Sequence, residues 1–224
     1  MSKQRRIIDL TMDVHEGMQT FQTYWHPFVE VTQLGRHGIE NRETRKLILG
    51  THTGTHVDAP RHFVPDGMTV DEIPLENMNG PAILLDFSDL DDCSCVTRSM
   101  LEDAVGTDSV ERVLIRFDGE KRLGTMAYYE DQPWLTDEAA QWLVDKGCKL
   151  IGLDVAMPDN PVNGRQGPTD SPVHKIFLTN QVVILEYLVD LKKIGARHFD
   201  LVVAPLKIRG GDGAPARCFA VVID

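Results

Sequence analysis

The sequence predicts an α/β protein built around a mixed β-sheet. Its 224 residues and its hydrophobic content of 42% suit one globular domain with a buried core and a pocket. Too many short β-branched segments are present for a helical protein, and they predict strands at residues 6–12, 28–33, 43–50, 81–87, 110–117, 148–155, 181–188, 198–205 and 216–223. No repeat, low-complexity tract or linker divides the chain, so we expect a single domain over residues 1–224.

Helical patterns are confined to shorter segments, at residues 97–105, 136–147, 171–179 and 189–196. Thr97 and Thr136 are suited to N-caps, and Gly147 is suited to end the second helix. Helices alternate with strands only in the second half of the chain, which predicts parallel crossovers there, up to the strand at 198–205. The first half is typical of hairpins, so the expected sheet is mixed, with a tendency to curl toward a barrel.

The composition excludes several functional classes. A net charge of -11 without any Lys/Arg run argues against a nucleic-acid partner, which requires clustered cations. No apolar run approaches the roughly 18 residues of a membrane span, and the first residues lack the apolar stretch of a signal peptide. We therefore expect a cytoplasmic protein with no membrane partner. The four cysteines show no CxxC spacing, so neither a disulfide framework nor a zinc ribbon is predicted.

The segment 51–63, THTGTHVDAPRHF, carries three of the eight histidines and an aspartate. In an extended chain His52, His56, Asp58 and His62 share one face, because strand side chains alternate. A lone histidine in a strand is usually structural, but several imidazoles and a carboxylate on one face favour a metal site. Two imidazoles and one carboxylate also leave coordination positions open for water and substrate, which indicates a catalytic rather than a structural metal.

This segment must bend to bind a cation. Fully extended, it would separate His52 from Asp58 by about 20 Å. Gly54 and Pro60 disfavour a helix and permit a bend, so we expect a bent loop that follows the strand at 43–50. The threonines at positions 51, 53 and 55 offer hydroxyls that can hold the outer ring nitrogens of the ligating histidines.

The run HTGTHVDAPRHF, followed by PDGMTVDEIPLENMNGPAILLDFS, resembles the "Putative cyclase" family of metal-dependent hydrolases, which includes bacterial kynurenine formamidase and isatin hydrolase. The shared motif is His-x-Gly-Thr-His-x-Asp-x-Pro-x-His. The resemblance extends from about Arg6 to the C-terminus and includes GLDVAMPDN, with Asp154, and HKIFLTNQVVILE, with His174 and Glu186. It implies a swivelling β/β/α domain, in which a mixed sheet partly closes into a barrel with outer helices.

The resemblance also implies a metal site. It makes His52, His56 and Asp58 the ligands of a first ion, and it lets Asp58 bridge to a second ion held by His174 and Glu186. The expected cofactor is therefore one or two divalent ions per chain. Nitrogen and oxygen ligands without sulfur are compatible with zinc, manganese or iron, and zinc and manganese are the joint first choices.

His62 has two interpretations. The resemblance implies a proton-transfer residue, which takes a proton from water and returns it to the departing nitrogen. The alternative is a further metal ligand. The family also implies a homodimer or higher homo-oligomer, with the site near the interface.

The substrate contacts are predicted less directly. Trp25 and Phe28, in an aromatic N-terminal segment, together with Phe63, can line an apolar pocket. This segment lacks the Pro-Gly-Asp turn of the family, which weakens the assignment of N-formylkynurenine as the substrate. Arg165 and Gln166 lie in a loop rich in Pro, Asn, Asp and Gly, where they can contact a substrate carboxylate.

Three functions follow from these observations. The first is a metal-dependent hydrolase that cleaves the C–N bond of a small linear or cyclic amide, with an aromatic substrate expected. The second is a polyketide-type cyclase or dehydratase that uses the same metal and base. The third is a metal-binding protein without activity, against which His62 argues, because a binding module needs no free base beside an open site. The sequence does not choose among the candidate amides.

Overall fold

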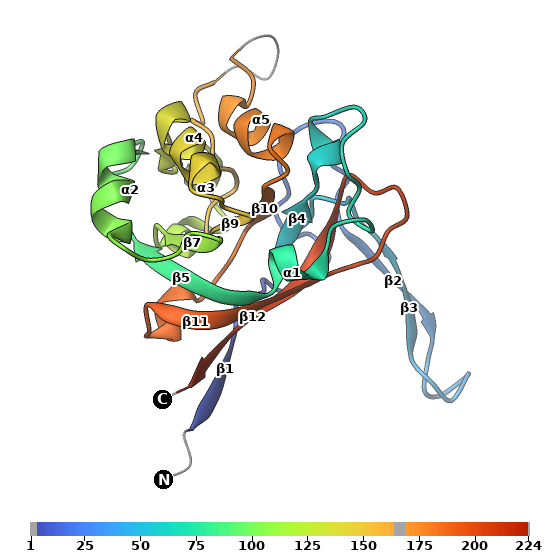
Figure 1. Cartoon of the computed structure of the whole chain (residues 1–224). Helices are drawn as coiled ribbons and strands as arrows, with labels where there is room; N and C mark the ends of the chain where they lie inside the picture. Colours follow the sequence, from blue (N-terminus) through green and yellow to red (C-terminus); the bar gives the residue numbers. More distant parts are fainter. Residues whose placement is uncertain (1–3, 164–168, 224) are drawn as a thin grey trace.

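The computed structural model describes residues 4–163 and 169–223. Its main sheet has the strand order β1-β12-β11-β5-β7-β9-β10-β4, and β4 also pairs with β12. The pairing of β4 with β12 closes seven strands into a barrel and leaves β1 outside the ring (Figure 1). The strands are β1 (Arg5–Asp9), β4 (His56–Asp58), β5 (Gly80–Asp86), β7 (Arg112–Arg116), β9 (Leu150–Leu153), β10 (Val183–Glu186), β11 (His198–Pro205) and β12 (Gly213–Ile223). The predicted mixed, barrel-like α/β fold is confirmed.

Strands β7, β9 and β10 are parallel neighbours, as the second half of the sequence predicts. Strand β5 lies in the first half, where we expected hairpins, but it runs parallel to β7 because helix α2 (Arg98–Val105) connects the two. Helices α2, α4 (Asp137–Asp145) and α5 (Pro172–Thr179) connect these four strands and gather on one side of the sheet (Figure 1). The two predicted N-caps are confirmed, because Thr97 accepts from the amide of Met100 and Thr136 from that of Ala139.

The last predicted crossover is wrong. Strand β11 runs antiparallel to both β5 and β12, and no α-helix lies between β10 and β11. The predicted helix at 189–196 is only the short 3-10 helix η3 (Leu191–Ile194), because Gly195, with φ +64°, ends it after one turn. Further short elements are η1 (Pro60–His62), α1 (Leu75–Met78), η2 (Gly119–Arg122), α3 (Ala127–Glu130) and a small sheet of β6 (Cys95–Val96) with β8 (Trp134–Leu135).

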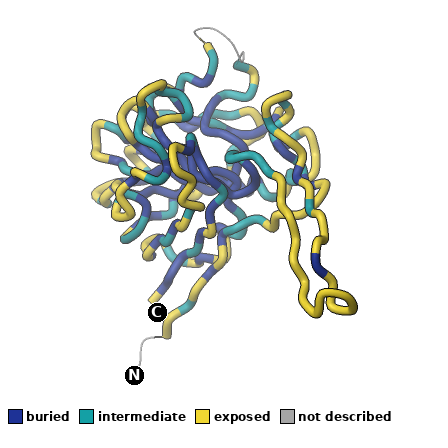
Figure 2. The backbone as a smooth tube through the Cα atoms, turned by 90° about the vertical axis from the view of Figure 1, so that its right-hand side faces the viewer, coloured by how far each residue is buried: buried dark blue, intermediate teal, exposed yellow. Residues whose placement is uncertain are grey.

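The predicted N-terminal hairpin forms an arm outside the barrel. Strands β2 (Glu30–Gly35) and β3 (Thr44–Ile48) pair only with each other among the described residues. Every residue of β3 is exposed, and Figure 2 shows the arm as a mostly exposed tube that projects from the body, with a short buried segment at Gly35. Because most residues of the arm are exposed, packing against the core stabilises it little, and a two-stranded hairpin is only marginally stable alone.

Side chains of the central strands alternate between two apolar layers. On β7, Leu114 belongs to the cluster inside the barrel, whereas Val113 and Ile115 belong to the cluster under the helices. Gly152 on β9 permits this close packing, because a Cβ atom there would lie 2.3 Å from the side chain of Leu114. Both faces of the parallel strands are therefore buried, which explains their continuous apolar sequence.

The barrel closes at β4, where we expected a loop. Residues 56–58 form a strand that pairs with β10 on one side and with β12 on the other. The sequence gives little sign of it, because three residues are too few to show a period. The expected bend is confirmed at Gly54, with φ +58°, and η1 starts at Pro60. Among the described residues, no helix is long and apolar enough to cross a membrane.

Candidate metal centre

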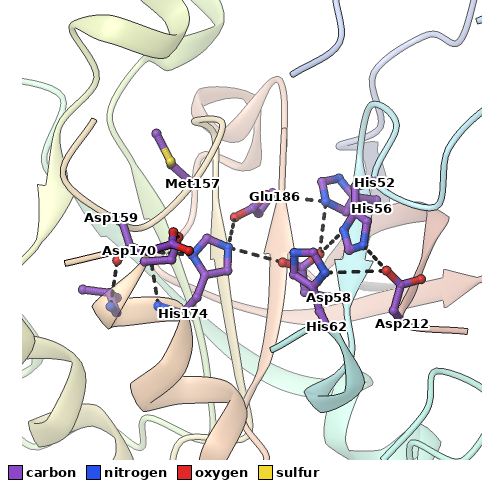
Figure 3. A network of polar contacts seen from close by, with 12 residues as sticks. His52, His56, Asp58, His62, Met157, Asp159, Asp170, His174, Glu186 and Asp212 are labelled. Carbon is purple, nitrogen blue, oxygen red and sulfur yellow. Dashed lines mark hydrogen bonds and ion pairs between the residues drawn. The ribbon is translucent and has the colours of Figure 1, made fainter. Parts of the chain in front are cut away.

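The closing strand β4 presents its first and last side chains to one buried cluster. Oδ1 of Asp58 lies 2.6 Å from Nδ1 of His52 and 3.1 Å from Nε2 of His56 (Figure 3). His56 and Asp58 are almost fully buried, and His52 is 9% exposed. The structure therefore brings together the three residues predicted to hold the first ion.

A second group of donors meets the other oxygen of the same carboxylate. Oδ2 of Asp58 lies 3.4 Å from Nε2 of His174, which in turn lies 3.2 Å from Oε1 of Glu186. Glu186 reaches this position because it pairs directly with His56 across β10 and β4, and opposed residues of neighbouring strands project to the same side. His174 enters from the first turn of α5.

The donor set fits divalent ions. Oε1 of Glu186 is buried and has no hydrogen-bond partner, so a cation would satisfy it. Two of these donor pairs are longer than ordinary hydrogen bonds: Nε2 of His56 with Oε2 of Glu186 at 3.5 Å, and Nε2 of His174 with Oδ2 of Asp58 at 3.4 Å. Such separations suit two ligands that each lie about 2.0 to 2.2 Å from one ion. His52, His56 and Asp58 can hold one ion, and Asp58, His174 and Glu186 can hold another.

Each ligating imidazole has an outer partner for its remaining ring nitrogen. Nδ1 of His56 lies 2.8 Å from the carbonyl oxygen of Gly54, and Nδ1 of His174 lies 2.5 Å from Oδ2 of Asp159. Nε2 of His52 lies 2.8 Å from Oδ2 of Asp212. Such partners fix the ring orientation and the tautomer of metal-binding histidines.

The predicted role of the threonine hydroxyls as those outer partners is wrong at Thr55. Its hydroxyl donates instead to the backbone carbonyl of Tyr187 and accepts from the amide of Met12. The hydroxyl thereby ties the start of β4 to the residues that follow β10. The outer partners of the imidazoles come from a carbonyl and from two carboxylates distant in sequence.

The pKa values of the cluster show that its buried carboxylates require positive charge beside them. Burial opposes protonation of His52, but Asp58 and Asp212 raise its pKa to about 10. Burial would raise the pKa of Asp58, but His52 and His62 hold it well below its usual value. Burial and the charge of Asp58 raise the pKa of Glu186. A proton on His52 helps to balance the carboxylates here, and a divalent ion can replace it.

His62 lies at the edge of the cluster. The turn η1 stacks its ring on His52, with 3.9 Å between ring centroids, and its side chain is 25% exposed. Its Nδ1 atom is 3.6 Å from Oδ2 of Asp212. His62 forms a group of potential donors with His52 and Asp212, and not with Asp58.

The donors line a cavity of about 240 Å³. Trp25 and Phe63, predicted as substrate contacts, form part of its wall together with Phe21 and His26. Phe28, also predicted, does not line it: its side chain is 80% exposed and faces a neighbouring cavity of about 1530 Å³.

The loop predicted as a wall of the site contributes at both ends. Met157, Asp170 and Ser171 line the cavity, whereas Arg165 and Gln166 lie outside the described residues.

Our sequence analysis missed three side chains: His26, Asp159 and Asp212. His26 lies in the N-terminal aromatic segment, and burial together with the charges of the other imidazoles lowers its pKa to about 4. Asp159 lies in the stretch GLDVAMPDN, where we had singled out Asp154. Asp154 instead accepts from the amides of Phe117 and Gly119 and supports the turn after β7.

Known proteins resemble this chain along most of its length. The family model described as "Putative cyclase" matches residues 8–160. Cyclase-like protein 3 of Oryza sativa subsp. japonica is 32% identical, with 96% of this chain and 80% of that protein covered. A kynurenine formamidase of Salinibacter ruber is 34% identical, with 76% of each chain covered.

Two solved structures share the fold of this chain, each at 26% sequence identity. Isatin hydrolase A from Labrenzia aggregata, bound to benzyl benzoate, superposes with a TM-score of 0.88 at 26% identity and covers 98% of this chain and 94% of its own. A potential metal-dependent hydrolase with cyclase activity superposes with a TM-score of 0.79 at 26% identity, with 99% and 100% covered. The barrel, the donor cluster and these matches agree: the chain belongs to the "Putative cyclase" family.

Proposed function

We propose that this protein is a metal-dependent hydrolase that cleaves the C–N bond of a small aromatic linear or cyclic amide. The observation that carries the proposal is the carboxylate of Asp58, shared between two sets of donors at a cavity with aromatic walls. Kynurenine formamidases and isatin hydrolases among the similar proteins support the reaction class.

The inner donors, which are the side chains of His52, His56, Asp58, His174 and Glu186, would hold one or two ions. Zinc and manganese are the first choices. Such ions, when bound, bring the pKa of a water molecule into the neutral range and polarise a carbonyl oxygen. The chain itself supplies a buried, rigid ligand set, because strand pairing fixes His56 against Glu186 and the carboxylate of Asp159 fixes His174.

In this proposal His62 transfers the proton. It lies next to the ligands and is still partly exposed, so its ring can take a proton from water and return it to the departing nitrogen. The rings of Trp25 and Phe63 would orient a flat substrate against the donors, because apolar walls with few polar groups favour an aromatic ring. A cavity of about 240 Å³ suits a small substrate.

The test is turnover before and after removal of metal. Prolonged chelation should abolish hydrolysis of N-formyl aromatic amines, cyclic imides or isatin, and zinc or manganese should restore it. Full activity in a preparation shown to be metal-free would overturn the proposal. Turnover of β-keto substrates without amide hydrolysis would favour the polyketide-type cyclase, and bound metal without any turnover would favour a binding protein.

A further inference from the structure

His62 and Asp212 form a pair on the outer side of the metal cluster. His52 lies between this pair and Asp58, because its Nδ1 atom faces Asp58 and its Nε2 atom faces Asp212. The ring of His62 stacks on the ring of His52 (Figure 3). Solvent reaches this pair, since the side chains of His62 and Asp212 are 25% and 41% exposed.

The separation of the pair suits a shared cation better than a shared proton. Nδ1 of His62 and Oδ2 of Asp212 are 3.6 Å apart, beyond hydrogen-bond distance. Two ligands that each lie about 2.0 to 2.2 Å from a tetrahedral ion are separated by about 3.3 to 3.6 Å. The contact of 2.8 Å from Nε2 of His52 also holds the carboxylate of Asp212 in place without any ion.

We propose that His62 and Asp212 bind a further divalent cation of the zinc class, outside the centre formed by Asp58, and that this ion inhibits the enzyme. An imidazole and a carboxylate select zinc, nickel, cobalt or copper over the harder magnesium and calcium. His52 is not a ligand of this ion, because its Nδ1 atom serves the inner centre and its Nε2 atom carries the proton donated to Asp212. With two protein ligands and water, the outer site binds more weakly than the inner ones.

Inhibition follows from the chemistry of the imidazole ring. A neutral ring has one nitrogen with a proton and one with a free electron pair. When a cation occupies Nδ1 of His62, the proton must sit on Nε2, and no nitrogen is left to accept a proton from water. This consequence rests on the proposed function, in which His62 transfers the proton. The binding of the ion does not depend on it.

The experiment uses protein that already carries its full inner complement of zinc. Free Zn²⁺ is raised in equilibrium dialysis, and bound zinc and initial rates are measured on the same samples. The wild type should bind an additional ion, and the rate should fall in step. In Asp212→Asn, both midpoints should move to at least about tenfold higher zinc, since removal of a ligand costs at least as much as removal of an outer partner. Mg²⁺ and Ca²⁺ should neither bind at this site nor inhibit.

A matched control is the pair of His198 and Asp108, on the surface, where Nε2 of the histidine lies 3.0 Å from a carboxylate oxygen. His198→Gln removes an imidazole of the same kind without touching the site, so both zinc midpoints should remain at wild-type values. His62→Gln provides a second variant that leaves Asp212 in place, and it should also lose the additional ion while it keeps the inner ones.

Equal zinc midpoints in the wild type, Asp212→Asn and His62→Gln would overturn the site. A shift in binding without any inhibition of the wild type would overturn the inhibitory role and leave the site standing. If no substrate is turned over, the proposed function fails, and the binding measurements still decide the outer site. Anomalous scattering at the zinc edge should give a peak between His62 and Asp212 in crystals soaked at high zinc, and its absence there would also count against the site.

Discussion

Oδ2 of Asp58 lies 3.4 Å from Nε2 of His174, and this contact joins the closing strand β4 to the start of helix α5. The other oxygen of the same carboxylate faces His52 and His56. A single aspartate thus connects two donor groups, one from the segment around β4 and one from β10 and α5. A carboxylate in this position can bridge two ions about 3.5 to 4 Å apart, as in two-metal hydrolases.

Glu186→Gln tests whether two ions bind. The substitution keeps the shape of the side chain and removes its charge, so the group of Asp58, His174 and Glu186 loses one of its two carboxylates. We expect elemental analysis to fall from about two ions per chain to about one, with loss of most activity. A wild type that holds only one ion under saturating conditions would instead make Glu186 an outer partner of a single centre.

His56→Ala and His62→Ala separate binding of metal from transfer of the proton. His56→Ala should lose the first ion and the activity together, because the histidine is buried among the inner donors. His62→Ala should keep most of the first ion and lose on the order of 10²- to 10⁴-fold in kcat, the usual contribution of a positioned proton-transfer group. Metal content measured beside kcat decides between the roles. Loss of the first ion in His62→Ala would make His62 a ligand.

Asp159→Asn tests an outer partner that lies outside the recognised motif. Its carboxylate holds Nδ1 of His174 and also accepts from the amides of Val173 and His174 at the start of α5. We expect metal affinity at the His174 side to fall about 10- to 100-fold, the usual cost of losing such a partner. Competition with a chelator measures this affinity. Asp145→Asn, an exposed carboxylate on α4, is the matched control and should leave it unchanged.

The fold could be predicted to a large extent because its signals are local. Every strand predicted from β-branched runs is present, and the caps at Thr97 and Thr136 hold their helices as expected. The direction of β11 could not be predicted, because it depends on which edges remain free after the parallel strands have formed. The strand β4 is short and gains its stability from two partners, so its own three residues do not reveal it.

The residues of the site also divide into those that a local sequence pattern reveals and those that it does not. His52, His56 and Asp58 are close in sequence, so spacing and residue type suffice to find them. Asp212 reaches His52 only because β12 pairs with β4, and nothing in the run GGDG indicates that contact. Residues that act on a site from distant segments follow from the closed barrel and not from any local pattern.

The N-terminal aromatic segment supports a prediction about assembly. Tyr24 is 95% exposed, Trp25 55% and Phe28 80%, although such side chains gain free energy when buried. We expect a homodimer in which these rings are covered, beside the cavity that Trp25 lines. Light scattering at micromolar concentration should give twice the monomer mass, and Phe28→Ser should shift the equilibrium toward monomer. A fully active monomeric wild type would contradict an interface beside the site.

Asp154 makes the free energy of unfolding depend on pH, independently of metal binding. Burial raises the pKa of its carboxyl to about 7, against the hydrogen bonds from the amides of Phe117 and Gly119. A carboxyl with a higher pKa in the folded than in the unfolded state binds its proton more tightly when folded. Ionisation of this carboxyl with rising pH therefore favours unfolding. The stabilising contribution of protonated Asp154 to the folded state is complete below the unfolded pKa of about 3.9 and is lost as the pH rises through about 7.

Asp154→Asn removes this titration and keeps a neutral side chain of the same shape. Below about pH 4 the variant should be less stable than the wild type, because its amide cannot accept from both backbone groups. Between about pH 4 and 7 the difference should shrink, or reverse, by an amount on the order of a few kcal/mol. Denaturant unfolding of both proteins at equal metal loading measures it, and comparison of the two cancels the titration of the metal ligands. A difference in unfolding free energy that stays constant across this range would show that Asp154 is already ionised in the folded protein, held by its two amide donors.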